Sequence, residues 1–200
     1  MKYLSTIPKA ARRITGVIAA ASAAGLIAVT AAAAAPSGAV LAADTARTTA
    51  TAVPACTAGD LGAWVAVTQG NGAAGSIFYP LQFTNLSGHA CAMRGFPGVS
   101  AIDRNGHQLG SPAGWDHTRP VRTVVLAAGA TAHATLRYSD ATVTTAPGCH
   151  PVSSMFELRV FPPNQRQATF AAFSMEACSH TGPVYLDVTP LQAGVGTRNG

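Results

Sequence analysis

Short apolar segments with polar residues at every second position recur along the chain from residue 56 onwards. The clearest spans residues 76–85, where the alternating apolar members are Ile77, Tyr79, Leu81 and Phe83. Residues 130–138 and 155–161 repeat the pattern. Because neighbouring side chains of a strand point to opposite faces, these segments predict strands with one buried and one exposed face. Pro80 inside the first segment indicates an edge position or a bulge.

The remaining apolar segments predict further strands. They lie at residues 61–68, 99–102, 107–109, 123–126, 168–173 and 184–188. Asn105 and Gly106, between the second and third of these segments, accept the backbone angles that a tight hairpin requires. The pattern therefore predicts an all-β fold, an immunoglobulin-like antiparallel β-sandwich of about seven to nine strands.

The first 43 residues differ from the rest. Their basic start consists of Lys2, Lys9, Arg12 and Arg13, and no charged residue follows between positions 14 and 43. This is the pattern of a secretory signal peptide, with small residues such as Ala43 at the cleavage site. A retained membrane-spanning helix and twin-arginine export are the alternatives. Alanine replaces most of the leucine and isoleucine that a stable membrane anchor needs, which favours cleavage.

We therefore expect four parts. They are a signal peptide (residues 1–43), a flexible Ala/Thr/Pro-rich linker (44–55), a β-sandwich domain (56–190) and a flexible C-terminal tail (191–200). The net charge of +5 belongs mostly to the first part, because nine arginines face eight acidic residues from Asp44 onwards, a net charge of +1. The arginines are scattered, which argues against nucleic acid as a partner. No membrane span is expected after cleavage.

All four cysteines lie in the exported part of the chain. They are Cys56, Cys91, Cys149 and Cys178. An even number in an oxidising compartment predicts two disulfides. Four cysteines permit three pairings, and their order favours Cys56 with Cys91 and Cys149 with Cys178. Residues 53–56 loosely match a lipid-attachment motif, but acylation of Cys56 would leave one cysteine unpaired, so a disulfide is favoured.

Several short motifs of the domain together resemble a known family. They are Cys-Thr-x-x-Asp-Leu at 56–61, Thr-Asn-Leu-Ser-Gly at 84–88 with Cys91 after it, Gly-Phe-Pro-Gly-Val at 95–99, Gly106, Leu109-Gly110, and Leu126 with Ala128-Gly129. The combination resembles the actinobacterial secreted family called domain of unknown function 4232. The resemblance implies a secreted or lipid-anchored β-sandwich without an assigned activity, and it supplies no catalytic residues.

No motif of the sequence specifies a reaction. The Gly-x-Gly-x-x-Gly run at residues 70–75 matches the dinucleotide-binding fingerprint, but a strand follows it where that motif needs a helix. A triad of Ser100, Asp116 and His117 could be assembled only by free choice among many residues. We therefore expect that the protein is not an enzyme and has no cofactor. A secreted hydrolase is kept as an alternative.

His89 and Met93 are weak metal-ligand candidates. Together with Cys91 they occupy alternate positions of one segment, and imidazole and sulfur ligands suit copper. A disulfide at Cys91 would leave only two ligands, so an extracytoplasmic copper-binding protein remains the alternative rather than the prediction. The other histidines, including His133 on the polar face of its strand, are expected at the surface.

The aromatic residues fall into two sets. Trp64, Tyr79 and Tyr138 lie in strand patterns and are expected in the core. Trp115 lies in a loop of glycine, proline and polar residues, so two interpretations are open. Either Trp115 contacts a partner together with His117 and Arg119, or its loop folds back and caps the end of the sandwich. The sequence thus predicts a secreted, or cell-envelope-associated, non-catalytic module whose polar loops at 111–122 and 139–152 bind an unknown protein or polysaccharide.

Overall fold

The structure, a computed structural model, describes residues 52–153 and 157–197, which belong to one compact unit. The expected signal peptide, and the expected linker up to residue 51, lie outside the described residues. So do Met155 and Phe156, with which the third alternating segment begins.

The larger sheet has seven strands. They are β1 (Leu61–Val65), β2 (Asn71–Ala73), β3 (Ser76–Asn85), β7 (Gly114–Trp115), β9 (Thr131–Tyr138), β14 (Leu186–Val188) and β15 (Gln192–Ala193). The strand order is β1-β3-β9-β14-β7, while β2 pairs with β3 and β15 with β9. Only β14 and β7 run parallel to each other; the other pairs of this sheet are antiparallel.

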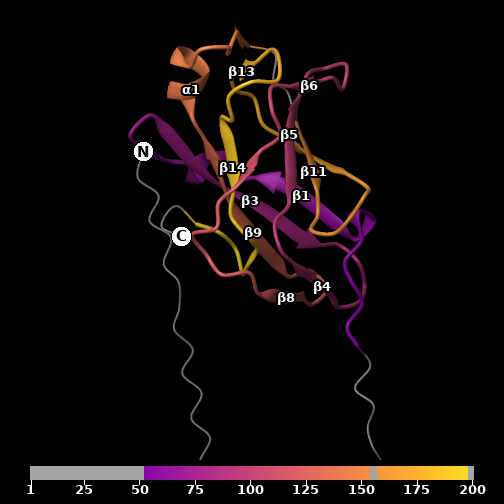
Figure 1. The fold of residues 1–200 in the computed structure, drawn as a ribbon. Coiled ribbons are helices and arrows are strands. Elements are labelled where there is room, and N and C mark those ends of the chain that lie inside the picture. Colours follow the sequence, from indigo (N-terminus) through magenta and orange to yellow (C-terminus); the bar gives the residue numbers. More distant parts are fainter. Residues whose placement is uncertain (1–51, 154–156, 198–200) are drawn as a thin grey trace, which may run out of the picture. The chain divides into compact units, whose positions relative to one another are not determined.

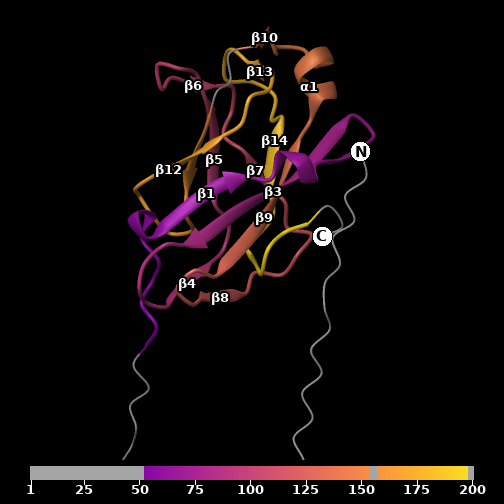
Figure 2. The same ribbon diagram turned by 180° about the vertical axis from the view of Figure 1, so that it is seen from behind.

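The smaller sheet has four strands in the order β12-β11-β5-β6. Their bounds are β12 (Thr169–Ala172), β11 (Glu157–Phe161), β5 (Gly98–Ile102) and β6 (Gln108–Leu109). Two further pairs are β4 (Cys91–Arg94) with β8 (Thr123–Leu126), and β10 (Pro151–Val152) with β13 (Ala177–Cys178). Figures 1 and 2 show α1 (Asp140–Thr145) and β13 at one end of the domain and β4 with β8 at the other. Short 3₁₀ turns, η1 (Ala58–Asp60) and η2 (Val67–Gln69), flank β1.

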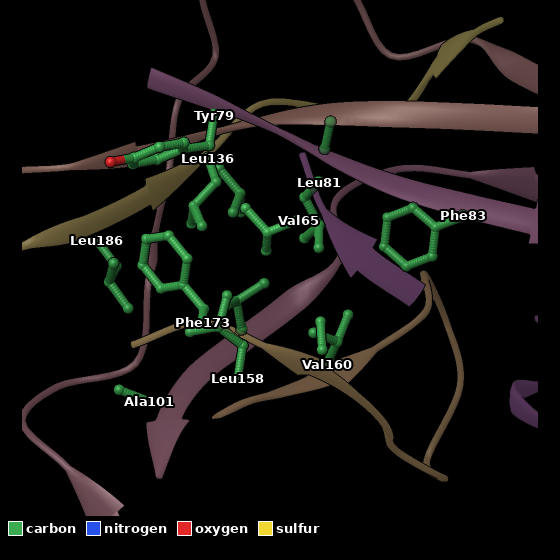
Figure 3. Packing of buried hydrophobic residues seen from close by; sticks show 14 of the residues in the cluster. Val65, Tyr79, Leu81, Phe83, Ala101, Leu136, Leu158, Val160, Phe173 and Leu186 are labelled. Atoms are coloured by element: carbon green, nitrogen blue, oxygen red, sulfur yellow. The ribbon is translucent and has the colours of Figure 1, made fainter. Parts of the chain in front are cut away.

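Apolar side chains of both sheets fill the space between them (Figure 3). Fully buried examples are Leu81, Phe83 and Leu136 of the larger sheet and Leu158 and Val160 of the smaller one, all 0% exposed. Burying one such side chain contributes about 1.5–3 kcal/mol relative to leaving it in water. The alternating segments therefore supply the core, which confirms the all-β sandwich. The described residues contain more strands than the seven to nine expected. Most of the additional strands are two or three residues long, which is too short to show an alternating pattern in the sequence.

Pro80 lies in an interior strand that pairs with β9 in an unbroken register, so the expected edge position or bulge is wrong. β3 pairs with β9 along one side, while on the other its residues 76–78 pair with β2 and residues 81–85 with β1. Pro80 lies between these two partners, and its carbonyl oxygen accepts a hydrogen bond from the Ala66 N–H on that side at 2.9 Å. Because a strand residue directs its N–H and C=O to the same side, the missing donor removes no hydrogen bond to β9.

The predicted hairpin between β5 and β6 is confirmed. Asp103 Oδ1 accepts hydrogen bonds from the backbone N–H groups of Asn105 at 2.8 Å and His107 at 2.9 Å. These donors, with that of His107 the stronger, hold the pKa of the Asp103 carboxyl below its usual value. Gly106 has φ +80°, which a glycine adopts without strain.

The glycine-rich run at residues 70–75 belongs to a second hairpin. Gly72 lies in β2, and the turn residues Ala74 and Gly75 have φ values of +48° and +75°. β3 begins at the next residue, so the run precedes a strand and not a helix N-terminus. The nucleotide-binding interpretation is therefore rejected, as the sequence context predicted.

Both favoured disulfides are present, Cys56–Cys91 and Cys149–Cys178. The first fastens the start of the domain to β4, and the second joins the segment after α1 to β13. They span 35 and 29 residues, and a cross-link of that length stabilises a fold by roughly 3 kcal/mol. With its sulfur in a disulfide, Cys56 has no thiol to carry a lipid.

Trp64 is not in the core. It is 45% exposed on the outer face of β1, whereas Leu61 and Val65 point inward and are 4% and 7% exposed. The inward positions of β1 are thus the odd-numbered ones, and the tryptophan falls on the other side of the pleat. The sequence correctly placed Trp64 in a strand, but it did not show that the side chain points to the outer face.

The C-terminal residues 191–197, here called the strap, are packed and not a flexible tail. They include β15, which pairs with β9, and Leu191, which is 0% exposed. Gln82 exchanges two hydrogen bonds with the backbone of Gly196, at 2.9 and 3.2 Å, and His133 Nδ1 lies 2.9 Å from the Gly194 oxygen. His133 is therefore buried, at 8% exposed, although the sequence placed it at the surface. Residues 198–200 lie outside the described residues.

Helix α1 was not predicted. It occupies part of the expected polar loop at residues 139–152 and begins after Ser139, whose Oγ accepts a hydrogen bond from the Thr142 N–H at 3.3 Å. Serine is a favoured residue at this position, because its oxygen satisfies a backbone donor that the helix leaves unpaired. The six-residue helix is too short to show a helical period in the sequence.

Candidate binding surface around Trp115

Trp115 lies in a segment that connects the two sheets. The Ala113 N–H donates to the Val99 oxygen of β5 at 2.8 Å, and the Asp116 N–H donates to the Val188 oxygen of β14 at 2.9 Å. Between these bonds, Gly114 passes so close to β14 that an added Cβ would lie 2.4 Å from Asp187 Oδ1. Backbone contacts with both sheets therefore hold the tryptophan in place.

Phe96 supports the indole ring of Trp115. The two rings are stacked with centroids 5.1 Å apart and an interplanar angle of 10°. His117 packs on the same phenylalanine at 4.7 Å with an angle of 59°. Phe96, Trp115 and His117 are here called the aromatic cluster. Despite the stack, Trp115 remains 59% exposed, so one face of a fixed ring is open to a ligand.

A groove of about 440 Å³ lies beside the aromatic cluster. Its lining comes from four chain segments: Arg94, Gly95, Phe96 and Gly98; Trp115; Val121; and Phe161, Pro162, Pro163, Asn164 and Gln165. Pro162 and Pro163 are buried, and their ring-locked φ angles make this part of the lining rigid. Asn164 has φ +61° and donates a hydrogen bond from Nδ2 to the Arg94 oxygen at 3.2 Å, which joins two sides of the groove.

Of the three predicted contact residues, the structure brings together Trp115 and His117. Arg119 lines a different cavity, of about 190 Å³, with Phe78, Arg137 and Asp187 on the outer face of the larger sheet. There the Arg137 Nε donates to Asp187 Oδ2 at 2.9 Å, and the Nη2 of the same arginine also contacts this oxygen. Arg119 is therefore separated from the groove of the aromatic cluster.

Phe96 and the two prolines were missed as site residues. Gly-Phe-Pro-Gly was noted only as a motif of the family, and Pro162-Pro163 carried no prediction of a site. Glycine and proline suit a turn, but a turn between strands can also present an aromatic ring. The available signal was the presence of an apolar ring among turn residues, where no core requires it.

The metal candidates have different environments. Met93 is 4% exposed within the core, whereas His89 is exposed in the turn before β4, and Cys91 between them is in a disulfide. Among residues 52–153 and 157–197, no three His, Cys, Asp or Glu side chains are grouped so that they could hold a metal ion. Neither residue lines the groove.

The three residues of the hypothetical triad are not connected. Ser100 is 6% exposed in β5, and Asp116 Oδ1 accepts a hydrogen bond from the Thr118 N–H at 2.9 Å. His117 contacts Phe96. Within the part of the chain that the structure describes, no hydrogen bond joins any two of Ser100, Asp116 and His117.

Comparisons with known proteins place the whole domain in one family. No described helix is long and apolar enough to cross a membrane. No curated protein and no solved structure matches the chain. The family model described as Domain of unknown function (DUF4232) matches residues 56–192, which include both disulfides, the aromatic cluster and the groove. The chain therefore belongs to the DUF4232 family.

Proposed function

We propose that the domain is a non-catalytic binding module that works outside the cytoplasm, secreted or associated with the cell envelope, and that its partner contacts the groove beside the aromatic cluster. The observation that carries the proposal is the ring of Trp115, 59% exposed yet fixed by its stack on Phe96. Large aromatic side chains in fixed positions dominate the energetics of protein binding sites. The two disulfides support an oxidising location.

The rigidity of the surface also supports a binding role. Trp115 is held through backbone bonds to both sheets, and the lining of the groove contains two buried prolines. A surface that is ordered before its ligand arrives loses little conformational entropy on binding, and more of the contact energy then appears as affinity. Such a scaffold suits recognition.

The proposal is tested with cell-envelope fractions of a producing organism. The purified protein and its Trp115→Ala variant are incubated with the fractions, and the sedimented protein is quantified. The matched control is Trp64→Ala, because Trp64 is the other exposed tryptophan and lies on the outer face of β1. We expect sedimentation to fall only in Trp115→Ala. Equal sedimentation of both variants and the unchanged protein would contradict the proposal.

A further inference from the structure

We propose that the groove beside the aromatic cluster binds an anionic polysaccharide, with a sugar ring on the open face of Trp115 and an acidic substituent paired with Arg94. The inference rests on the proposed binding function and adds the chemical class of the ligand. Three features support it: the flat aromatic ring of Trp115, an exposed Arg94 without a described ion pair, and a terminal strand, β7, that is too short to extend the larger sheet with a peptide.

The open face of Trp115 suits a sugar ring. An aromatic ring carries negative charge density on its face, which attracts the weakly positive C–H groups on the flat side of a sugar. The stack on Phe96, at 10° from parallel, keeps this face at a fixed angle beside the groove. Arg94, Asn164 and Gln165 add polar groups to the lining, and such groups can bind the hydroxyls around a sugar's edge.

Exposed arginines favour a ligand that also carries negative charge. Arg94 lines the groove, and Arg122 and Arg166 each directly follow a lining residue in the chain. None of the three forms an ion pair within the described part of the chain. No described carboxylate lines the groove, since Asp116, the neighbour of Trp115, lines the cavity that contains Arg119. A guanidinium group binds a carboxylate or a phosphate with two parallel hydrogen bonds.

The backbone at the groove does not favour an acidic peptide. Extended peptides gain affinity by adding a strand to a free sheet edge. β7 is the terminal strand of the larger sheet at the groove, but it has two residues. The N–H groups on both sides of it, of Ala113 and Asp116, already donate to β5 and β14. A polysaccharide needs no strand edge, because its contacts are made by rings and hydroxyls.

The experiment compares polymers that differ in one property. Isothermal titration calorimetry of the purified full-length protein uses polygalacturonate, its methyl ester as the uncharged counterpart with the same sugar ring, and poly-L-glutamate as a charged chain without sugar. At low salt we expect polygalacturonate to bind roughly tenfold more tightly than the other two, and raising the salt concentration to weaken it, because exposed charges are screened.

Four variants assign the binding to the groove. Trp115→Ala should weaken polygalacturonate binding roughly 30-fold, as expected for a central aromatic contact. Arg94→Gln should weaken it roughly tenfold through the loss of a charge-assisted pair. The matched controls Trp64→Ala and Arg119→Gln, which replace the same residue types away from the groove, should stay within about twofold of the unchanged protein. Melting temperatures verify that all four variants fold.

Each contrary outcome overturns a defined part of the proposal. Equal affinity for the methyl ester would overturn the anionic part, and equal affinity for poly-L-glutamate would overturn the sugar part in favour of an acidic protein. No binding of polygalacturonate, while Trp115→Ala still loses envelope binding, would overturn the ligand class but retain the proposed function. If the envelope fractions retain Trp115→Ala normally, the function itself fails.

Discussion

The two faces of the larger sheet are both buried near its centre, but by different means. On the inner face, Leu81, Phe83 and Leu136 are 0% exposed and pack against apolar side chains of the smaller sheet (Figure 3). On the outer face, Gln82 and His133 are 1% and 8% exposed beneath the strap, residues 191–197. Apolar contact stabilises the first face, and hydrogen bonds to a covering segment stabilise the second.

The difference determines what a substitution does on each side. Removing an inner side chain costs its transfer free energy and leaves a cavity. Removing an outer one leaves buried N–H and C=O groups of the strap without partners, which costs their desolvation. The fit of the strap is also steric, since a Cβ at Gly196 would lie 2.7 Å from the His133 ring and 2.9 Å from Pro80 Cβ. Substitutions on the two faces therefore compare these two kinds of burial.

The largest effect is expected on the inner face. Phe83→Ala should lower the free energy of unfolding by about 3–5 kcal/mol, because a fully buried aromatic side chain is lost and the two sheets can close the space only partly. Chemical denaturation with intact disulfides measures it. Val125→Ala, which removes an apolar side chain that is 55% exposed, is the control and should change stability by less than about 0.5 kcal/mol. A loss below 1.5 kcal/mol in Phe83→Ala would contradict this account of the core.

A smaller effect is expected beneath the strap. Gln82→Leu keeps much of the side-chain volume but removes both hydrogen bonds to Gly196. The free energy of unfolding should therefore fall by about 1–3 kcal/mol. Amide hydrogen exchange should accelerate at Gly196 before the core strands respond, because the strap can open locally. Gln69→Leu, at an exposed glutamine of η2, is the matched control. Unchanged protection at Gly196 would show that the amide of Gln82 does not hold the strap.

The inner face could be predicted from sequence, and the outer covering could not. The alternation of apolar residues in 76–85 and 130–138 reports directly which side chains are buried, because a strand has a fixed period of two. The strap has no such period. Its position depends on Gln82 and His133, which look like ordinary outward polar residues, and on glycines close to the end of the chain.

The candidate site was predictable only in part for the same reason. Trp115 was recognised because a large ring stood in a loop of small and polar residues. Its partner Phe96 is brought to it by the packing of β7 beside β14 and β5, and that contact joins segments without a shared pattern. The stacking of Phe96 on Trp115 depends on how distant strands are arranged in the sheets. No local pattern in the sequence therefore identifies this contact.

The inner face should also determine the alkaline limit of stability. Burial raises the pKa of Tyr138 to about 12 and raises that of Tyr185 as well. Both phenols therefore stay protonated in the fold at a pH where an unfolded chain loses their protons, near 10. Below pH 10 the two phenols make their full contribution to the free energy of unfolding. As the pH rises towards 12 this contribution is lost, and the free energy of unfolding falls by up to about 1.4 kcal/mol per pH unit for each tyrosine.

Tyr138→Phe tests this dependence. Phenylalanine does not titrate, so the variant should lose stability less steeply between pH 10 and 12, as measured by denaturant unfolding at several pH values. Tyr185→Phe should show the same flattening, but it also removes the hydrogen bond from the Tyr185 hydroxyl to the Leu109 oxygen, at 2.9 Å, and should be about 1 kcal/mol less stable at neutral pH. An unchanged slope in both variants would contradict the assignment.

The smallest effect is expected at Trp64, on the outer face beyond the strap. Trp64 pairs in register with Gln82 but is 45% exposed, so Trp64→Ala removes a side chain that the fold covers only in part. Denaturant unfolding should show a loss below about 1 kcal/mol, within the range of strand preference at an edge. A loss as large as that of Phe83→Ala would mean that the strap and β1 form a second apolar core. The distinction between apolar burial inside and hydrogen-bonded burial outside would then no longer hold, and Trp64 could not serve as the control for Trp115.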